Sequence, residues 1–158
     1  MASTPDVPTF RTRSHLRHRR ALAPAFEHAR VADAMEYGLL TCSPSAGLSV
    51  VAGIMAGNDV HCVAVRGVAG PVGVGFVFPV DLACARAGEG GSSAGEIARP
   101  AVTVNPEEPL ARAALLMRDK GVTHLLVVEP GAPEPVGLLS SMDLAYVMAW
   151  GVGSDAEA

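Results

Sequence analysis

The sequence predicts a mixed α/β fold (α+β) in which two β-α-β-β-α repeats pack around a pseudo-two-fold axis. One observation is that residues 31–88 match residues 93–150 without a gap when they are moved by 62 positions. Another is that each copy alternates short apolar runs of strand length with a segment of helical periodicity. Composition agrees, because 49% of the residues are hydrophobic and 18% are charged, as in a globular domain. One such unit leaves a sheet face uncovered, so the two copies are expected to pack together.

The repeat is spread over the whole length of both copies. Its clearest part is GFVFPVDLAC at residues 75–84, which corresponds to GLLSSMDLAY at residues 137–146. The identities at a separation of 62 are Ala32/Ala94, Thr41/Thr103, Pro44/Pro106, Leu48/Leu110, Ala52/Ala114, Met55/Met117, Val60/Val122, Val65/Val127, Pro71/Pro133, Val74/Val136, Gly75/Gly137, Asp81/Asp143, Leu82/Leu144 and Ala83/Ala145. We therefore expect Val63 and Leu125 to lie in the same kind of element.

The second copy shows its elements most clearly. A short strand over residues 101–104 is followed by Asn105, a suitable N-cap, and by Pro106, which fits the first helical position. Glu108 can complete a capping box, and Gly121 can end the helix in the left-handed conformation. Apolar residues between them recur at three- and four-residue spacing, which predicts a helix that begins at Pro106 and ends before Gly121.

Two further strands and a second helix complete the copy. The apolar runs 124–128 and 136–140 have strand length and are separated by the turn-rich loop EPGAPEP. The second helix is predicted from Ser140 to Trp150, with Ser140 as N-cap and Asp143 at the third helical position.

The chain divides by composition into five segments. A basic arm precedes the repeats, a short tail follows them, and the Gly/Ser-rich stretch between the copies is expected to be a flexible linker. A short lead-in opens each copy, at residues 31–37 and 94–99. The predicted boundaries are a basic arm at 1–30, repeat 1 at 31–88, a linker at 89–93, repeat 2 at 94–151 and a tail at 152–158.

Positive charge is concentrated at the N-terminus. The net charge is −4 overall, and residues 1–30 carry six Arg against Asp6 and Glu27, so the remainder carries about −8, which is −4 minus +4. The basic tract has no aromatic platform for bases and the body is acidic, so nucleic acid is not an expected partner. No apolar run is long enough to span a membrane and the N-terminus does not resemble a signal peptide, so a cytoplasmic protein is expected.

The sequence offers no catalytic or metal-binding constellation. Cys42, Cys62 and Cys84 lie far apart among apolar neighbours, which is typical of reduced core thiols rather than of disulfides or metal ligands. No glycine loop of the GxxxxGK[ST] type is present. Ser140 lacks the context of a nucleophile elbow, and Asp143 has no second carboxylate nearby as an acid-base partner. We therefore expect no enzyme activity, no metal and no cofactor.

These motifs together resemble the CBS domain family. The resemblance rests on the Val-Thr-Val strand, the Pro-opened helix, VTHLLVV at 122–128 and the pattern G-h-h-S-x-x-D-L at 137–144, where h is apolar. Two such units in tandem are similar to a Bateman module. This resemblance implies a stand-alone regulatory module that senses AMP, ADP or ATP in the cleft between the repeats, usually as a homodimer, on behalf of an unknown effector protein. S-adenosylmethionine as the ligand, or a dimerising scaffold without a ligand, are the alternatives.

The resemblance also implies a set of ligand contacts. The family's signature Ser and Asp fall on Ser140 and Asp143, and in the family this Asp accepts hydrogen bonds from both ribose hydroxyls. The chemistry is suitable, because a carboxylate presents two acceptor oxygens to a vicinal diol. The other implied ligand-binding positions are Ala101, Val102 and Thr103 for the base, Thr123 and His124 for the phosphate, and Gly137 at the start of the signature. A helix-start role for Asp143 and the β propensity of Thr103 account for those residues without a ligand.

The first copy is expected to hold the weaker site. Its corresponding residues are Leu40, Thr41, His61 and Asp81. It has Phe78 and Pro79 where the second copy has Ser140 and Ser141, so it lacks a hydroxyl and a backbone N–H that Pro79 cannot supply. One principal adenine-nucleotide site per chain is therefore predicted, on the second copy.

Overall fold

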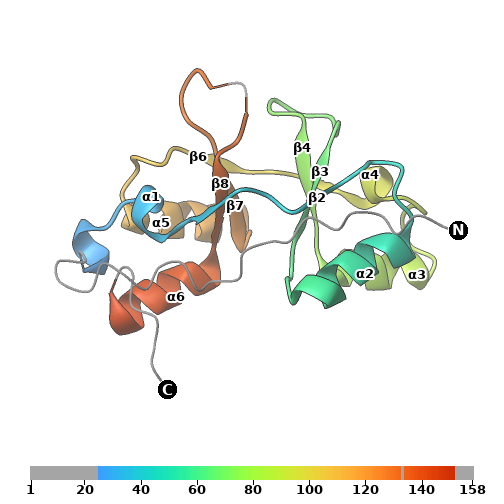
Figure 1. Cartoon of the computed structure of the whole chain (residues 1–158), viewed down its shortest axis with the longest axis horizontal. Helices are drawn as coiled ribbons and strands as arrows, with labels where there is room; N and C mark the ends of the chain where they lie inside the picture. Colours follow the sequence, from blue (N-terminus) through green and yellow to red (C-terminus); the bar gives the residue numbers. More distant parts are fainter. Residues whose placement is uncertain (1–24, 133, 152–158) are drawn as a thin grey trace, which may run out of the picture.

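The computed structural model describes residues 25–132 and 134–151, which form two α/β halves side by side (Figure 1). Residues 1–24 of the predicted basic arm, and the predicted tail, lie outside the described residues. The elements in chain order are η2 (Phe26–His28), α1 (Val31–Ala34), β1 (Glu36–Tyr37), β2 (Thr41–Cys42), α2 (Leu48–Asn58), β3 (Val63–Arg66), β4 (Val74–Val77), α3 (Pro79–Arg86), α4 (Ala94–Ile97), β5 (Arg99–Pro100), β6 (Thr103–Val104), α5 (Leu110–Lys120), β7 (His124–Val127), β8 (Gly137–Ser140) and α6 (Ser141–Trp150). The predicted mixed α/β fold class is confirmed.

Each half contains a four-stranded sheet, and the two sheets have the same internal pairing. Their strand orders are β2-β3-β4-β5 and β1-β8-β7-β6. β2 and β6 pair in parallel with β3 and β7, which pair antiparallel with β4 and β8. Val63 lies opposite Val77, and Leu125 lies opposite Leu139, so the register is preserved by a shift of 62 residues. The expectation that Val63 and Leu125 occupy the same kind of element is confirmed.

The two lead-ins are exchanged between the halves. β1 precedes the first copy but pairs with β8 of the second, whereas β5 precedes the second copy and pairs with β4 of the first. The Val31 N–H donates to the Glu108 carbonyl at 2.9 Å, and the Ala94 N–H donates to the Ala46 carbonyl at 2.8 Å. Figure 1 shows the chain running from α1, beside α5, across the molecule to β2. Each half is therefore completed by a segment from the other copy.

The gapless match predicted from the sequence is wrong at the lead-ins. Arg30 and Ser93 are the N-caps of α1 and α4, and these two positions are separated by 63 residues instead of 62. The strands β1 and β5 are also 63 residues apart, because Glu36 and Arg99 pair with Leu138 and Phe76, which are equivalent in the repeat. Three residues, 38–40, therefore connect β1 to β2 where two connect β5 to β6. Gly38 is among these three and has a φ of +83°, which favours glycine.

The first long helix of the second copy begins later than its capping signals predict. α5 starts at Leu110 with Pro109 as N-cap. The Leu110 N–H donates at 2.9 Å to the carbonyl of Ala29 in the lead-in, and the Pro106 carbonyl accepts at 2.9 Å from the Ala32 N–H. A helix from Pro106 would use that carbonyl and that N–H for its own first turn. Pairing with the exchanged lead-in therefore overrides the local helix signal.

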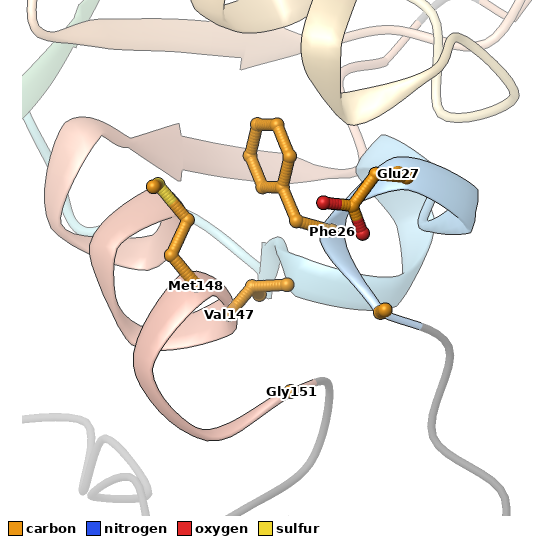
Figure 2. A pocket seen from close by; sticks show the side chains of 6 residues that line it. Phe26, Glu27, Val147, Met148 and Gly151 are labelled. Atoms are coloured by element: carbon orange, nitrogen blue, oxygen red, sulfur yellow. The ribbon is translucent and has the colours of Figure 1, made fainter.

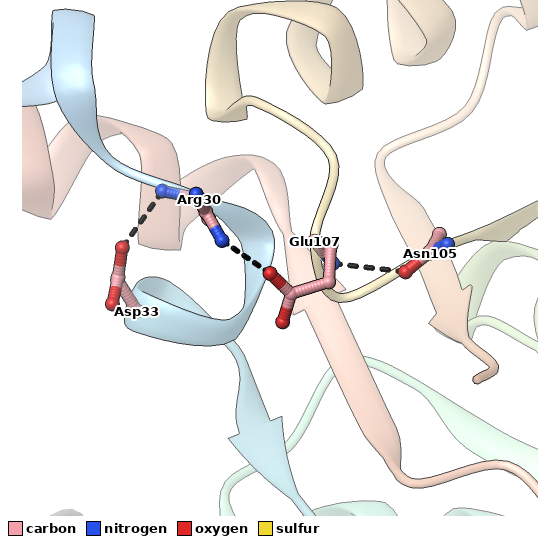
Figure 3. A network of polar contacts seen from close by, with 4 residues as sticks. All are labelled: Arg30, Asp33, Asn105 and Glu107. Atoms are coloured by element: carbon pink, nitrogen blue, oxygen red, sulfur yellow. Dashed lines mark hydrogen bonds and ion pairs between the residues drawn. The ribbon is translucent and has the colours of Figure 1, made fainter.

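Side chains reinforce this contact between lead-in and second half (Figure 3). The Arg30 N–H donates to Asp33 Oδ2 at 2.8 Å, and the Arg30 guanidinium forms an ion pair with Glu107. Asn105 Oδ1 accepts from the Glu107 N–H at 2.9 Å and orders the turn that carries Glu107. The ion pair is exposed on both sides, so it contributes about 0 to 1 kcal/mol. The backbone pairing and apolar burial of the lead-in stabilise the contact more.

The Gly/Ser-rich stretch between the copies is also more structured than a flexible linker. The N–H groups of Ser92 and Ser93 donate to Glu96 Oε2 at 2.6 and 3.1 Å. These backbone hydrogen bonds hold the pKa of Glu96 below its ordinary value. Ala94 follows directly and is fully buried in the first half. The predicted linker therefore ends in a capped helix start that is fixed to the first copy.

Three apolar clusters hold the molecule together. The core of the second half includes Ala29 from the end of the predicted arm, and Val31 and Met35 from the first lead-in, so residues 29–35 are integral to that half. The core of the first half includes Ala94 from the second lead-in. A third cluster joins the two sheets through Cys62, Ala64, Val74, Phe76 and Leu126. The predicted packing of the two copies against one another is confirmed by this third cluster.

Candidate functional site

The signature of the second copy forms the N-terminus of α6. Asp143 Oδ2 accepts hydrogen bonds from the Ser140 N–H at 2.7 Å and from Ser140 Oγ at 2.9 Å. Ser140 Oγ lies 3.3 Å from the Asp143 N–H, so the two residues form a capping box. The predicted helix start at Ser140 is confirmed. Asp143 is 8% exposed, and among the described residues it is the one charged side chain classed as buried. Helix capping alone does not require such burial.

Thr123 and His124 lie beside this signature. His124 is opposite Ser140 in the β7–β8 pair, and the Ser141 N–H donates to the Thr123 carbonyl at 2.8 Å. Thr123 Oγ1 and His124 Nδ1 are 2.9 Å apart. Four of the predicted site residues, Thr123, His124, Ser140 and Asp143, are therefore brought together. Their hydroxyls, imidazole and carboxylate surround the start of a ten-residue helix, whose N–H groups favour anions.

His124 also faces residues of the first copy. Burial, and secondly the nearby His61, lower the pKa of His124 to about 4, so its imidazole is neutral at pH 7. The Phe78 ring lies 5.2 Å from the His124 ring, between centroids. This contact places His124 of the second copy against the first copy.

The predicted base contacts are divided between two places. The Ala101 N–H donates to the Val74 carbonyl at 3.1 Å, and the Ala101 side chain packs on the cluster between the sheets. Val102 packs on the core of the second half. Thr103 is exposed and lines a separate groove of about 420 Å³ near the N-terminal end of α5. Ala101 is thus the member of the three that faces the other copy.

Gly137 lies at the far end of β8 from Ser140. A Cβ at this position would overlap the carbonyl oxygen of Glu36 and lie 2.6 Å from Met35 Cε. Gly75, its counterpart in the first copy, faces the Arg99 carbonyl oxygen, which a Cβ would approach to 2.9 Å. Each glycine of the repeated signature therefore leaves the room that the exchanged lead-in needs to pair with its strand. This packing explains Gly137 without a ligand.

The first copy has the same carboxylate with a different partner. Asp81 Oδ2 accepts from the Phe78 N–H at 2.9 Å, which matches the bond between Asp143 and Ser140. Asp81 Oδ1 accepts from Arg99 Nε at 2.8 Å and also from Arg99 Nη2. Arg99 was not predicted as a site residue, because it belongs to the lead-in of the second copy and reaches Asp81 only through the exchange.

The other predicted residues of the first copy do not gather around Asp81 in one cluster. The Leu40 carbonyl accepts from the Ala64 N–H at 2.9 Å, and the Leu40 side chain packs on the first core. Thr41 is exposed and pairs with Ala64. His61 is exposed next to Cys62. Burial, and secondly the Asp81 charge, raise the pKa of Cys62 to about 12, so this thiol is protonated at neutral pH while it stays buried.

A second groove lies at the other end of α6 (Figure 2). It has a volume of about 230 Å³, and Phe26 and Glu27 of η2 face Val147 and Met148 across it. Neither this groove nor the one beside Thr103 includes Ser140 or Asp143. The predicted site therefore corresponds to the contact between the copies and not to either open groove.

Within residues 25–132 and 134–151, no three or more His, Cys, Asp or Glu side chains are grouped in a way that could hold a metal ion. No helix in these ranges combines the length and the apolar character needed to cross a bilayer.

The fold and this site define a paired-repeat α/β module with exchanged lead-ins and a carboxylate-capped helix in each half. Residues 94–149 match the family model of the CBS domain. The second repeat is therefore a CBS domain, and the chain as a whole has the fold of tandem CBS domain pairs.

Solved structures of CBS domain pairs have the same fold. The pair of protein MJ0100, in complex with 5'-methylthioadenosine and S-adenosylmethionine, matches with a TM-score of 0.67 and 21% identity. The match covers 77% of this chain and 96% of the MJ0100 chain. CBSX2 in complex with AMP matches with a TM-score of 0.64 and 20% identity, over 76% of this chain and 96% of the CBSX2 chain. The CBS domain of a bacterial CNNM/CorC family Mg²⁺ transporter in complex with ATP gives 0.66 at 17% identity, over 80% and 92%. No curated protein matches the chain in sequence.

Proposed function

We propose that this chain is a regulatory module without enzyme activity that binds one adenine nucleotide between its two copies, at the signature of the second. The observation that carries the proposal is the convergence of Thr123, His124, Ser140 and Asp143 at the N-terminus of α6. The similar structures that hold AMP and ATP support this choice of ligand class. An adenine nucleotide offers a vicinal diol to the carboxylate and a phosphate to the helix N-terminus.

Each residue has a definite role in this proposal. Asp143 accepts hydrogen bonds from the ribose hydroxyls, and Ser140, whose hydroxyl can rotate, binds the phosphate together with Thr123. His124 is neutral before binding and becomes a charged donor when a phosphate offsets the cost of its burial. His61 approaches the same phosphate from the first copy, and Ala101 contacts the base from the strand that faces that copy.

Asp143→Asn tests the carboxylate while it keeps an acceptor for the Ser140 N–H. Because charge-assisted hydrogen bonds contribute about 1.5 to 3 kcal/mol, we expect AMP, ADP or ATP to bind tenfold to a hundredfold more weakly by calorimetry. The matched control is Asp81→Asn, which should leave the affinity within about twofold of wild type. Undiminished binding by a folded Asp143→Asn variant would return Asp143 to a purely helix-capping role.

S-adenosylmethionine is the second candidate ligand. The MJ0100 pair holds it together with 5'-methylthioadenosine, and both share the adenosine group with the nucleotides. A thermal-shift panel of AMP, ADP, ATP and S-adenosylmethionine separates the candidates, since a ligand at 100 times its Kd adds about 2.7 kcal/mol.

The proposal includes a homodimer and an effector protein. Large apolar side chains are exposed on four helices, which a single module leaves uncovered. They are Val50 on α2, Val80 on α3, Leu115 on α5, and Met142, Met148 and Trp150 on α6. Light scattering should give twice the mass of the chain, and a monomer at high concentration would contradict this part. A flat ligand panel with a dimer would favour the scaffold.

We place the module in the cytoplasm. Cys42, Cys62 and Cys84 are free thiols, which agrees with a reducing compartment. The proposal includes neither membrane insertion nor nucleic-acid binding.

A further inference from the structure

We infer that Arg99 and Phe78 close the signature of the first copy, so that this position is a latent ligand site occupied by the chain's own side chains. The inference rests on the proposed function, because it takes the first signature as a site of the same chemical class, an adenine nucleotide. It concerns what occupies the Asp81 carboxylate of the first copy.

Arg99 takes the place of a ligand on Asp81. Two guanidinium N–H groups, Nε and Nη2, donate to the single oxygen Asp81 Oδ1. A ribose diol would likewise present two neighbouring donors to this carboxylate. The Asp81 side chain is 9% exposed and that of Arg99 is 59% exposed, so the guanidinium lies on the solvent side of the carboxylate. A ligand must therefore displace Arg99 to reach Asp81.

Phe78 fills the space beside the carboxylate. Its ring packs at 66° to that of Phe76, with centroids 6.2 Å apart, and also contacts the His124 ring. Arg99 Cζ lies 5.8 Å from the centre of the same ring, within the range of a cation-π contact. Phe78 and Arg99 therefore hold one another in place over Asp81 and occupy the position where the second copy has only the hydroxyl of Ser140.

The second copy has neither closing residue. Ser140 corresponds to Phe78, and the lead-in residue that corresponds to Arg99 is Glu36, because Arg99 lies opposite Phe76 and Glu36 lies opposite Leu138, its equivalent in the repeat. An acidic side chain cannot form the Arg99 ion pair with Asp143. The two exchanged lead-ins thus differ, because one closes the first signature with Arg99 and the other carries Glu36 at the equivalent position.

The test converts the first signature into the second. The variant Phe78→Ser, Pro79→Ser, Arg99→Ala restores the hydroxyl and the backbone N–H and removes the guanidinium. Calorimetry with AMP should give two sites per chain where the wild type gives one, and adding Asp143→Asn to this variant should leave one. The matched control is Arg66→Ala, which removes an equal charge from the exposed ion pair with Glu134 and should keep a single site.

A second measurement does not depend on any ligand. Cys62 is 7% exposed and lies in the cluster that Phe78 packs against, so its reaction with a maleimide reports opening of this cleft. In a Cys42→Ser, Cys84→Ser background, Phe78→Ser should speed the labelling of Cys62 at least tenfold. Arg99 is retained in this variant so that the charge near the thiol stays the same.

The outcomes separate the inference from the proposed function. Unchanged labelling of the Phe78→Ser variant would overturn the closure. Faster labelling of that variant together with a single AMP site in the converted variant would overturn the latent site. If the wild type binds no AMP, the converted variant binds one and the Phe78→Ser variant is labelled faster, the closed first signature stands and the proposed function of the second signature fails.

Discussion

Gly137→Ala should destabilise the protein more than any other single methyl group added to a described glycine of its strands. The new Cβ would overlap the Glu36 carbonyl and approach Met35 Cε to 2.6 Å, so β1 must move away from β8. Overpacking of this kind costs about 1 to 3 kcal/mol. Loss of a β1 hydrogen bond adds about 0.5 to 1.5 kcal/mol. We therefore expect the free energy of unfolding to fall by about 2 to 4 kcal/mol.

Urea unfolding followed by circular dichroism measures this loss. Gly75→Ala should cost less, because its closest neighbour would be the Arg99 carbonyl at 2.9 Å. Gly53→Ala is the matched control, since Gly53 lies inside α2 with no atom near its missing Cβ. There the change should stabilise the protein by about 0.5 to 1 kcal/mol. A Gly137→Ala variant within 0.5 kcal/mol of wild type would refute the close approach of the exchanged strand.

Two further predictions concern the contact between the copies. Because the pKa of His124 is lowered from 6.5 to about 4, the unfolded chain takes up a proton between these values that the folded chain does not. The stability that neutral His124 contributes is present above pH 6.5 and is lost as the pH falls to 4. The loss amounts to about 1 to 3 kcal/mol after discounting for partial exposure. His124→Gln should remove this pH-dependent loss in urea titrations. A chain cut at a protease site inserted after Glu89 should elute as one species of intact size, because the exchanged lead-ins join the fragments. Fragments that separated without denaturant would contradict that exchange.

Local signals in the sequence predict most of the elements but not their partners. Apolar spacing and the Ser140 cap correctly predict α6, and the apolar runs correctly predict β7 and β8. The lead-ins are too short for periodicity to specify a sheet edge, so their exchange was not predicted. The later start of α5 has the same origin, since the groups that would begin a helix at Pro106 pair with the exchanged segment. Tertiary pairing is not encoded in local propensity.

The candidate site was predictable where its residues are close in sequence or adjacent across a hairpin. Ser140 and Asp143 are one helical turn apart, and His124 is their neighbour through the β7–β8 pair. At the first signature, by contrast, Arg99 comes from the second copy and Phe78 from the first. The predicted weakness of the first copy rested on the missing Ser hydroxyl and N–H, whereas the ion pair between Arg99 and Asp81 becomes visible only when the exchanged strand is placed.

The exchanged lead-ins bear on how such a chain can originate. A single copy on its own would have a sheet without its edge strand and a lead-in without a sheet, and two separate copies could satisfy both needs only as a strand-swapped dimer. Tandem duplication makes that swap intramolecular, where a tether supplies an effective concentration on the order of millimolar. Fusion also ends the requirement for identical halves. Arg99 and Glu36 occupy equivalent positions with opposite charge, a difference that a symmetric dimer of one gene product could not carry.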